Sequence, residues 1–346
     1  MLKRVLVGLL CFMLIFATVA GCANNAGNKD NDPNDNAGDN APAEKIVVKV
    51  GYENNPGEPL DIACNRWADL VKERSNGQIE VQLYPSSQLG TKKDLTEQML
   101  MGANVITITD PSFLMDYVPD MGIISGPYLA ESYDQLFKLF ESDWYKGKVE
   151  ELEAKGLTIV ADNWIYGDRH ILANKPVRKA EDLKGLKIRV PNNPIGIKTI
   201  EAMGGTPTPM PLGEVYPALA QGVINGAENP LPVLYGAKLY ESAKYLSLTE
   251  HMNMIIFWIG SAQFFDKIPA ESAELIKKAG YDAGVYMGEV NEESDKKAIE
   301  DFKAAGVEII EDVDKETFRN LTKEIYGDFP EWSKGLYDTV QEEMKK

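Results

Sequence analysis

The chain has 346 residues, of which 53 are acidic and 36 are basic, so its formal net charge is −17. Such an acidic surface repels phosphates and anionic lipids, which argues against nucleic-acid binding and against direct adsorption to a lipid surface. Beyond a polar N-terminal region about 300 residues remain, which is too many for one simple core and suits two α/β lobes.

The first 21 residues have the composition of an export signal. Lys3 and Arg4 precede an apolar run over 5–19, which is shorter than the roughly 20 residues that a membrane-spanning helix needs. Small residues and then Cys22 follow, which predicts a lipoprotein signal peptide over 1–21 and a lipid on Cys22. An ordinary cleaved signal is the alternative. Loss of Lys3 and Arg4 would change the net charge from −17 to −19.

Residues 22–45 consist almost entirely of Asn, Asp, Gly, Pro, Ala and Lys, which predicts a flexible tether. We therefore expect an extracytoplasmic protein, either lipid-anchored to the outer face of the cell membrane or periplasmic. Cys11 lies in the signal and Cys22 is the lipid site, so Cys64 has no partner for an intramolecular disulfide. Its apolar neighbours predict a buried, unreactive thiol.

From residue 46 onward, segments with strand and helix patterns alternate. Strands are predicted over 46–51, 79–83, 105–109, 157–163 and 254–260. Helices are predicted over 60–74, 91–101, 132–140 and 146–155. This alternation implies a mainly parallel sheet, with ligands at the carboxyl ends of its strands. Residues 269–305 favour helix almost throughout, as one unusually long helix or as two in succession.

Two dense motif blocks lie between Asp182 and Pro232. The first reads DLKGLKIRVPNNP, and the second reads GGTPTPMPLGEVYPALAQGVINGAENPLP. Their order and spacing resemble the solute-binding subunits of tripartite ATP-independent periplasmic (TRAP) transporters, the DctP family, which capture organic acids outside the cell. The resemblance implies a two-lobed α/β fold of the periplasmic-binding-protein type (type II-like), with hinged lobes and a long helix that spans both.

The resemblance also implies an organisation and a set of partners. We expect the first lobe to comprise 46–167 and 255–294, and the second lobe 168–254 and 295–346. The expected partners are a small organic acid and the small and large TRAP membrane subunits, with a monomeric binding protein. No cofactor, no metal and no catalytic residue is expected.

Arg189 is the central candidate because it stands at the end of a short strand closed by Pro191. A planar guanidinium donates two parallel hydrogen bonds to a carboxylate, which replaces the water that an organic acid loses on binding. A lone arginine at a strand end is more often a surface ion-pair residue. The resemblance changes this weighting, because the family's carboxylate clamp is the arginine of the KIRVP-like element, which is intact here.

Other candidates depend more strongly on the resemblance. It assigns Asn229 to the same carboxylate and Arg169 to a further cleft position, and we expect an anion between the two arginines because like charges repel. His170, beside Arg169, is interpreted as an orienting or packing group. Asp110 follows a strand and would bind hydroxyl or amine groups of the solute, or else cap the segment before Pro111.

The remaining candidates are polar loop residues and aromatic residues near the lobe boundaries. They are Glu53, Asn192, Tyr52, Trp164, Tyr166, Tyr216 and Trp258. Many neutral or acidic groups with one carboxylate clamp favour a sugar acid, namely a uronate such as glucuronate or galacturonate. A C4-dicarboxylate or another carboxylate is the alternative, although Asp110 would repel a second carboxylate.

An enzyme finds little support in the sequence. There are only two histidines, His170 and His251, without metal-ligand spacing, and there is no P-loop, dinucleotide-binding glycine pattern or G-x-S-x-G elbow. A glycosidase with two carboxylates remains a formal alternative, because 53 acids offer many pairs. A binding lipoprotein of an ABC transporter is the second alternative, and a sensory receptor is the third.

Overall fold

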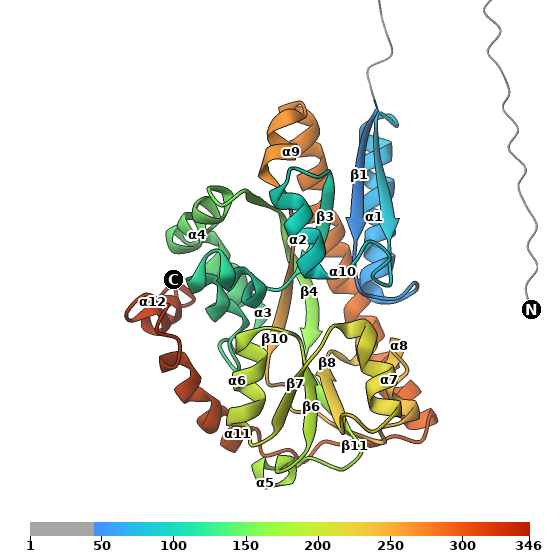
Figure 1. The fold of residues 1–346 in the computed structure, drawn as a ribbon, viewed down its shortest axis with the longest axis vertical. Helices are drawn as coiled ribbons and strands as arrows, with labels where there is room; N and C mark the ends of the chain where they lie inside the picture. The colour runs from blue at the N-terminus through green and yellow to red at the C-terminus, as the bar shows by residue number, and fades with distance from the viewer. Residues whose placement is uncertain (1–44) are drawn as a thin grey trace, which may run out of the picture. The chain divides into compact units, whose positions relative to one another are not determined.

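The computed structural model describes residues 45–346, which carry two β-sheets joined by a long helix (Figure 1). Residues 1–44 lie outside the described part, and with them the predicted signal peptide, Cys22 and nearly all of the predicted tether. Within 45–346, none of the helices combines the length and the apolar character that crossing a bilayer requires.

The first sheet has the strand order β2-β1-β3-β10-β4. Its strands are β1 (Ile46–Gly51), β2 (Ile79–Tyr84), β3 (Val105–Thr109), β4 (Leu157–Asp168) and β10 (Asn253–Ser261). The helices of this lobe are α1 (Pro59–Arg74), α2 (Lys92–Leu100), α3 (Tyr133–Glu141), α4 (Asp143–Glu153) and α9 (Ala262–Lys267). Two 3-10 segments, η1 (Pro111–Asp116) and η2 (Pro119–Ser125), follow β3. Strand β3 lies inside the sheet and is buried at every residue, as a strand covered on both faces should be.

The second sheet has the strand order β11-β9-β5-β8-β6-β7. Its strands are β5 (His170–Ala173), β6 (Lys187–Val190), β7 (Thr206–Pro209), β8 (Gly226–Asn229), β9 (Tyr245–Ser247) and β11 (Glu308–Ile310). The helices of this lobe are α5 (Ala180–Leu183), α6 (Pro194–Ala202), α7 (Val215–Ala220), α8 (Leu231–Gly236) and α11 (Lys315–Thr322), with 3-10 segments η3 (Leu212–Glu214) and η4 (Leu239–Glu241). The prediction of two α/β lobes is confirmed.

Both sheets are mainly parallel, as expected, but each contains one antiparallel strand, β10 in the first sheet and β5 in the second. Strand β1 runs parallel to β2 and β3, but β10 is antiparallel to both β3 and β4. The reason is the path of the chain between the lobes. Strand β4 leads from the first sheet into β5 of the second, and β10 leads back from β9, so the two connecting strands run in opposite directions.

The long helix is α10 (Ala270–Ala304), a single element of 35 residues. Ile276 and Ala283 of its first half pack in the core of the first lobe, whereas Ala298 and Phe302 pack in the core of the second. Figure 1 shows α10 running along both lobes. The expectation of a long helix that spans both lobes is therefore confirmed.

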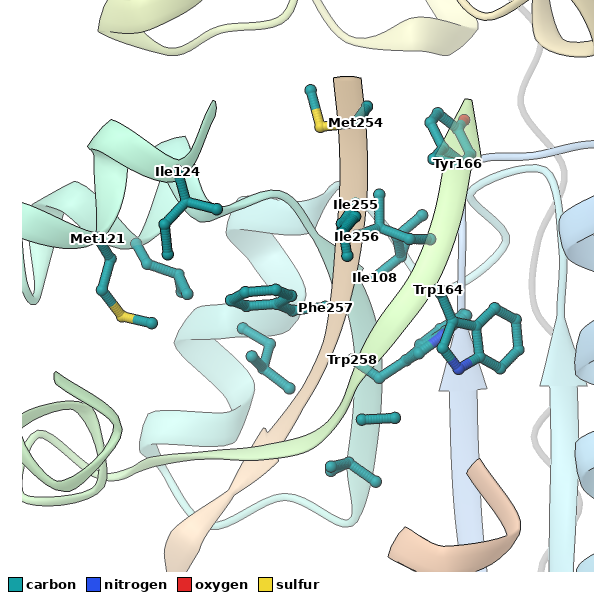
Figure 2. Close-up of a cluster of buried hydrophobic side chains, with 14 of the residues drawn as sticks. Ile108, Met121, Ile124, Trp164, Tyr166, Met254, Ile255, Ile256, Phe257 and Trp258 are labelled. Carbon is teal, nitrogen blue, oxygen red and sulfur yellow. The ribbon is translucent and has the colours of Figure 1, made fainter. Parts of the chain in front are cut away.

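A cluster of three tryptophans connects α1 with the first sheet, and two of the three bond to α10. The rings of Trp67, Trp164 and Trp258 lie 5.1 to 5.9 Å apart between centroids, and Figure 2 shows Trp164 beside Trp258. The indole N–H of Trp67 donates to the carbonyl of Ile276 at 3.0 Å, and that of Trp164 donates to the carbonyl of Gly280 at 2.9 Å. These bonds satisfy two buried donors and hold α10 against both α1 and strand β4.

The C-terminal segment returns to the first lobe. After α11, η5 (Lys323–Gly327) and α12 (Leu336–Glu343) follow, and Figure 1 shows α12 close to α3. Phe329, Trp332 and Val340 pack in the core of the first lobe. The lobe limits expected from the sequence place 295–346 with the second lobe, and these contacts differ from that expectation. Contacts between residues far apart in the chain decide such a boundary, and local periodicity does not report them.

Candidate functional site

A small cavity lies between the two lobes, where β1, β3, β6 and β8 end. Its first-lobe wall carries the polar residues Glu53, Asn54, Lys92 and Asp110. Its second-lobe wall carries Arg189 and Asn229, and Arg169 and Tyr166 line it near the crossing strands. The enclosed space is about 30 Å³, room for one or two water molecules, so the opposing side chains nearly meet in this conformation.

Arg189 is buried, with 3% of its surface exposed, at the carboxyl end of β6. Its Nε and Nη2 donate to the backbone carbonyl of Met210 at 3.0 and 2.8 Å, which fixes the plane of the guanidinium. Within residues 45–346, no carboxylate oxygen lies within 4.0 Å of it. Burial lowers the pKa of Arg189 from its ordinary value. The cation is thus desolvated, oriented and without a counter-ion from the described residues, which is what an anion-binding group requires.

Asn229 ends β8, the parallel neighbour of β6, so both side chains reach the same edge of the sheet. It is 5% exposed, and its Oδ1 has no hydrogen-bond partner among the described residues. Oxygen and nitrogen of a side-chain amide are assigned from the hydrogen-bond network, so the amide can present a donor or an acceptor to a ligand. A buried amide without a partner facing a cavity marks a place where a ligand group fits.

Arg169 differs from Arg189 because it already has a partner. It forms a buried salt bridge with Glu228, in which Nη2 lies 2.7 Å from Oε1 and Nε pairs with Oε2. Burial alone would raise the pKa of Glu228, but the charge of Arg169, together with the hydrogen bonds from Arg169 and His251, outweighs burial and lowers that pKa to about 2. His251 lies on the other side, with Nε2 3.4 Å from Oε2 of Glu228 and Nδ1 2.8 Å from Oγ1 of Thr249. The expected anion beside the arginines includes a carboxylate of the protein itself.

On the first-lobe wall, Lys92 lies between two acids. Its Nζ is 3.2 Å from Oε2 of Glu53 and 3.9 Å from Oδ2 of Asp110. Asp110 also caps η1 by accepting a hydrogen bond from the N–H of Ser112 at 3.2 Å, so it combines the capping role with a place in the cavity. One ammonium and two carboxylates give this wall a formal charge of −1.

The sequence reasoning missed Lys92 and Glu228. Lys92 begins α2, which follows the carboxyl end of β2, and this is the same edge of the sheet at which Glu53 follows β1 and Asp110 follows β3. That shared edge could have indicated Lys92. Glu228 is adjacent to Asn229, but the partner of a buried arginine cannot be read from a single sequence.

Several aromatic candidates lie elsewhere. Trp164 and Trp258 belong to the tryptophan cluster beneath the cavity, while Tyr166, two residues beyond Trp164 on β4, reaches its wall (Figure 2). Tyr52 is buried and donates to Oδ1 of Asp61 at 2.6 Å. Tyr216 is 41% exposed on α7 and bonds to an exposed glutamate. Tyr166 and Trp164 lie on the same face of β4, but only Tyr166 is near enough to the end of the strand to line the cavity.

Two polar candidates also lie away from the cavity wall. Asn192 is exposed after β6, and the following Asn193 caps α6 by accepting from the N–H of Gly196 at 2.7 Å. His170 is buried on β5, where its Nδ1 accepts from the N–H of Glu250 at 3.4 Å. Burial lowers the pKa of His170 to about 3, so the imidazole is neutral at physiological pH and suits the packing role.

Residues 50–331 match the sequence profile of the family described as bacterial extracellular solute-binding protein, family 7, or DctP. The chain belongs to this family. Members are the solute-binding proteins of TRAP transporters, which act outside the cytoplasm, bind organic acids and are not enzymes. Within residues 45–346, no group of three or more His, Cys, Asp and Glu side chains is placed to hold a metal ion.

Solved structures and a characterised relative agree with this assignment. A TRAP periplasmic solute-binding protein from Ochrobacterium anthropi, solved with L-fuconate, is 53% identical, with a TM-score of 0.85 over 87% of this chain and 99% of the other. A second, from Actinobacillus succinogenes with L-galactonate, is 43% identical, with a TM-score of 0.85 and the same coverage. The sialic acid-binding periplasmic protein SiaP of Vibrio cholerae is 31% identical over 82% of this chain and 88% of its own length.

Proposed function

We propose that this TRAP solute-binding protein captures a sugar acid that carries one carboxylate, with Arg189 as the carboxylate clamp. The observation that carries the proposal is the geometry of Arg189, a buried guanidinium held by Met210 and left without a counter-ion by the described residues. A ligand carboxylate would supply the missing charge through Nη1 and Nη2, with Asn229 beside it. Charge-assisted bonds of this kind contribute about 1.5–3 kcal/mol each.

The opposite wall supports a solute with hydroxyl groups at its other end. Glu53 and Asp110 accept hydrogen bonds, Lys92 donates them, and Asn54 and Tyr166 do both. The net charge of the wall disfavours a second carboxylate there, which argues against a C4-dicarboxylate. A monocarboxylic polyol satisfies both walls with its two ends.

The choice between an aldonate and a uronate rests on the ligands bound in the solved structures of relatives. The solved relatives with L-fuconate and L-galactonate are 53% and 43% identical, whereas those with D-galacturonate and D-glucuronate are 29% and 30% identical. L-Fuconate is L-galactonate without its C6 hydroxyl. We therefore favour a six-carbon aldonate of this configuration, and the uronate expected from the sequence becomes the second candidate.

Binding requires the lobes to separate, because the enclosed space is far too small for a six-carbon acid. We propose that the solute enters an open form, contacts both walls and thereby shifts the population toward the closed form. The closed form then delivers the solute to the small and large TRAP membrane subunits. A lipid on Cys22, which lies outside the described residues, would keep the protein at the membrane, and mass spectrometry of the mature N-terminus tests this.

Thermal unfolding of the purified chain against a ligand panel tests the substrate class. The panel comprises L-fuconate, L-galactonate, D-glucuronate, D-galacturonate, galactarate, succinate and neutral galactose. At 100 times the dissociation constant, a ligand stabilises the native state by about 2.7 kcal/mol. We expect the largest shift with an aldonate and none with galactose. A shift with succinate or galactose alone would contradict the proposal.

A further inference from the structure

A buried carboxylate outside the cavity wall connects the two lobes. Glu58 is 7% exposed in the turn between β1 and α1, where it occupies the N-cap position of α1 without capping it. Its Oε2 accepts a hydrogen bond from Nδ2 of Asn54 at 2.7 Å, and its Oε1 accepts one from Nδ2 of Asn55 at 3.0 Å. The carboxylate thus turns back from the helix to hold the loop that carries Asn54.

Asn54 transmits this contact to the cavity. It is 1% exposed, and its Nδ2 donates a second bond to the hydroxyl of Tyr166 at 3.0 Å. Both Asn54 and Tyr166 line the cavity wall. The position of Glu58 therefore fixes two polar groups that face the solute, although Glu58 does not line the cavity itself.

Gly236 of the second lobe lies directly against Glu58. A Cβ atom at position 236 would stand 2.4 Å from Oε1 of Glu58 and 2.8 Å from its Cδ and Cγ. The φ angle of Gly236 is not in the left-handed region, so the backbone does not require glycine there. Gly236 ends α8, the helix that begins two residues after Asn229. The absence of a side chain at this position allows the two lobes to approach each other at the end of the helix that follows Asn229.

The chemistry of the contact between Glu58 and Gly236 indicates that Glu58 does more than pack against the second lobe. Within the described residues no lysine or arginine nitrogen lies within 4.0 Å of Glu58, and burial raises its pKa to about 7. A carboxylate is costly in such a place, and an apolar side chain would pack at lower cost. What the carboxylate provides is acceptors for Asn54 and Asn55 at the surface where the lobes meet.

We propose that Glu58 is a positioning residue of the solute site, which closes against Gly236 and thereby sets Asn54 and Tyr166 at the cavity when the lobes come together. This inference rests on the proposed sugar-acid function for its affinity measurements. It assigns to the Glu58–Gly236 contact a role in the closed form, which the chain also samples without solute, and none in the folding of either lobe.

Calorimetric titration with L-galactonate tests this role in three variants. Gly236→Ala should weaken binding about tenfold or more, because the methyl group strikes Glu58 on closure. Its melting temperature without ligand should stay level or rise, because alanine favours helix. Gly147→Ala, in helix α4 with nothing within 4 Å of the added methyl, is the matched control and should bind as the parent does. Glu58→Gln, which keeps an acceptor for Asn54, should retain affinity within about threefold.

A double-mutant cycle separates positioning from general damage. Glu58→Ala removes the Cγ, Cδ and Oε1 atoms that the new methyl group would contact. In that background Gly236→Ala should therefore cause little further loss of affinity. Fully additive losses would overturn the proposal. Equal affinity of Gly236→Ala and the parent would also overturn it.

Amide hydrogen exchange of the unliganded chain gives a reading that needs no solute. Gly236→Ala should accelerate exchange in both 54–62 and 231–237, whereas Gly147→Ala should accelerate neither. Unchanged exchange in both segments would remove the contact and with it the inference. If the parent chain binds no sugar acid, the proposed function fails, while hydrogen exchange still decides whether the two lobes meet at Glu58 and Gly236.

Discussion

The two walls of the cavity balance their charges in different ways. On the second-lobe wall, Arg169 is neutralised by Glu228 while Arg189 has no carboxylate among the described residues, so the wall is positive at one place. On the first-lobe wall, Lys92 is shared by Glu53 and Asp110, so the wall is negative overall and its charges are spread. The second-lobe wall therefore offers one free guanidinium that can bind a carboxylate. The first-lobe wall offers several separate donors and acceptors that can bind hydroxyl groups. This polarity indicates which end of the solute each lobe holds.

Glu228→Gln should have the largest effect, because it leaves Arg169 buried without its partner. Breaking a buried salt bridge by removing one member costs about 3–5 kcal/mol. We expect a loss of that order in the free energy of unfolding at pH 7, measured by urea denaturation. Glu292→Gln, an exposed glutamate paired with Lys296, should leave the free energy of unfolding unchanged within the error of the measurement.

The pH dependence of the same pair has a defined sign. The pKa of Glu228 is lowered to about 2 from an ordinary value of 4.5. Its contribution to stability is thus fully present above about pH 4.5 and is lost as the pH falls toward 2, because the unfolded chain takes up the proton first. The parent chain should lose stability across this window more steeply than Glu228→Gln. Parallel curves would show that Glu228 is not held as a carboxylate by Arg169.

Arg189→Lys should sharpen the contrast between the two arginines. The ammonium keeps the charge but loses the planar fork, so affinity for L-galactonate should fall roughly 10- to 100-fold, equivalent to one charge-assisted bond. The melting temperature without ligand should remain nearly unchanged, because Arg189 takes part in no ion pair among the described residues. Arg178→Lys, at an exposed ion pair with Asp312, is the control for the same substitution. An equal loss of folding stability in Arg189→Lys would assign the residue a structural role.

Asp110→Asn tests the negative wall. Removing one carboxylate reduces the repulsion of a second acidic group, so the affinity for galactarate relative to L-galactonate should rise roughly 5- to 10-fold. The asparagine retains an oxygen for the N–H of Ser112, which keeps η1 capped. Asp116→Asn, an exposed acid in the same segment, should leave the ratio unchanged. An unchanged ratio in Asp110→Asn would show that this wall does not select the charge of the solute.

Much of the fold could be predicted from local pattern. Strand β3 spans the predicted 105–109, helix α1 begins one residue before the predicted 60–74, and the helix-forming stretch 269–305 is the single helix α10. The mainly parallel strand direction was predicted as well, but the single antiparallel strand of each sheet was not, because it depends on where the chain crosses between the lobes. The C-terminal segment from Phe329 to Val340 packs in the core of the first lobe, whereas the sequence assigned it to the second. This packing also depends on contacts between distant parts of the chain.

The residues of the site likewise fall into those that local sequence could predict and those that it could not. Residues that directly follow strands, such as Asp110 and Asn229, could be proposed from sequence because strand ends share an edge of the sheet. The aromatic candidates could not be sorted, because the depth of a ring depends on partners such as Trp67, about a hundred residues away from Trp164. Charge partners such as Glu228 for Arg169 are equally non-local.

Tyr166→Phe and Tyr216→Phe should have the smallest effects on affinity. Both remove one hydroxyl, the first at the cavity wall and the second on the exposed surface of α7. The hydroxyl of Tyr166 accepts from Asn54 and lines the cavity, so its removal should weaken L-galactonate binding by about 1 kcal/mol, roughly fivefold. The hydroxyl of Tyr216 contacts only the exposed Glu241 among the described residues, and its loss should change neither affinity nor melting temperature measurably. Equal losses of affinity in both variants would place Tyr216 at the solute after all, and would require a closed form in which α7 moves toward the first lobe.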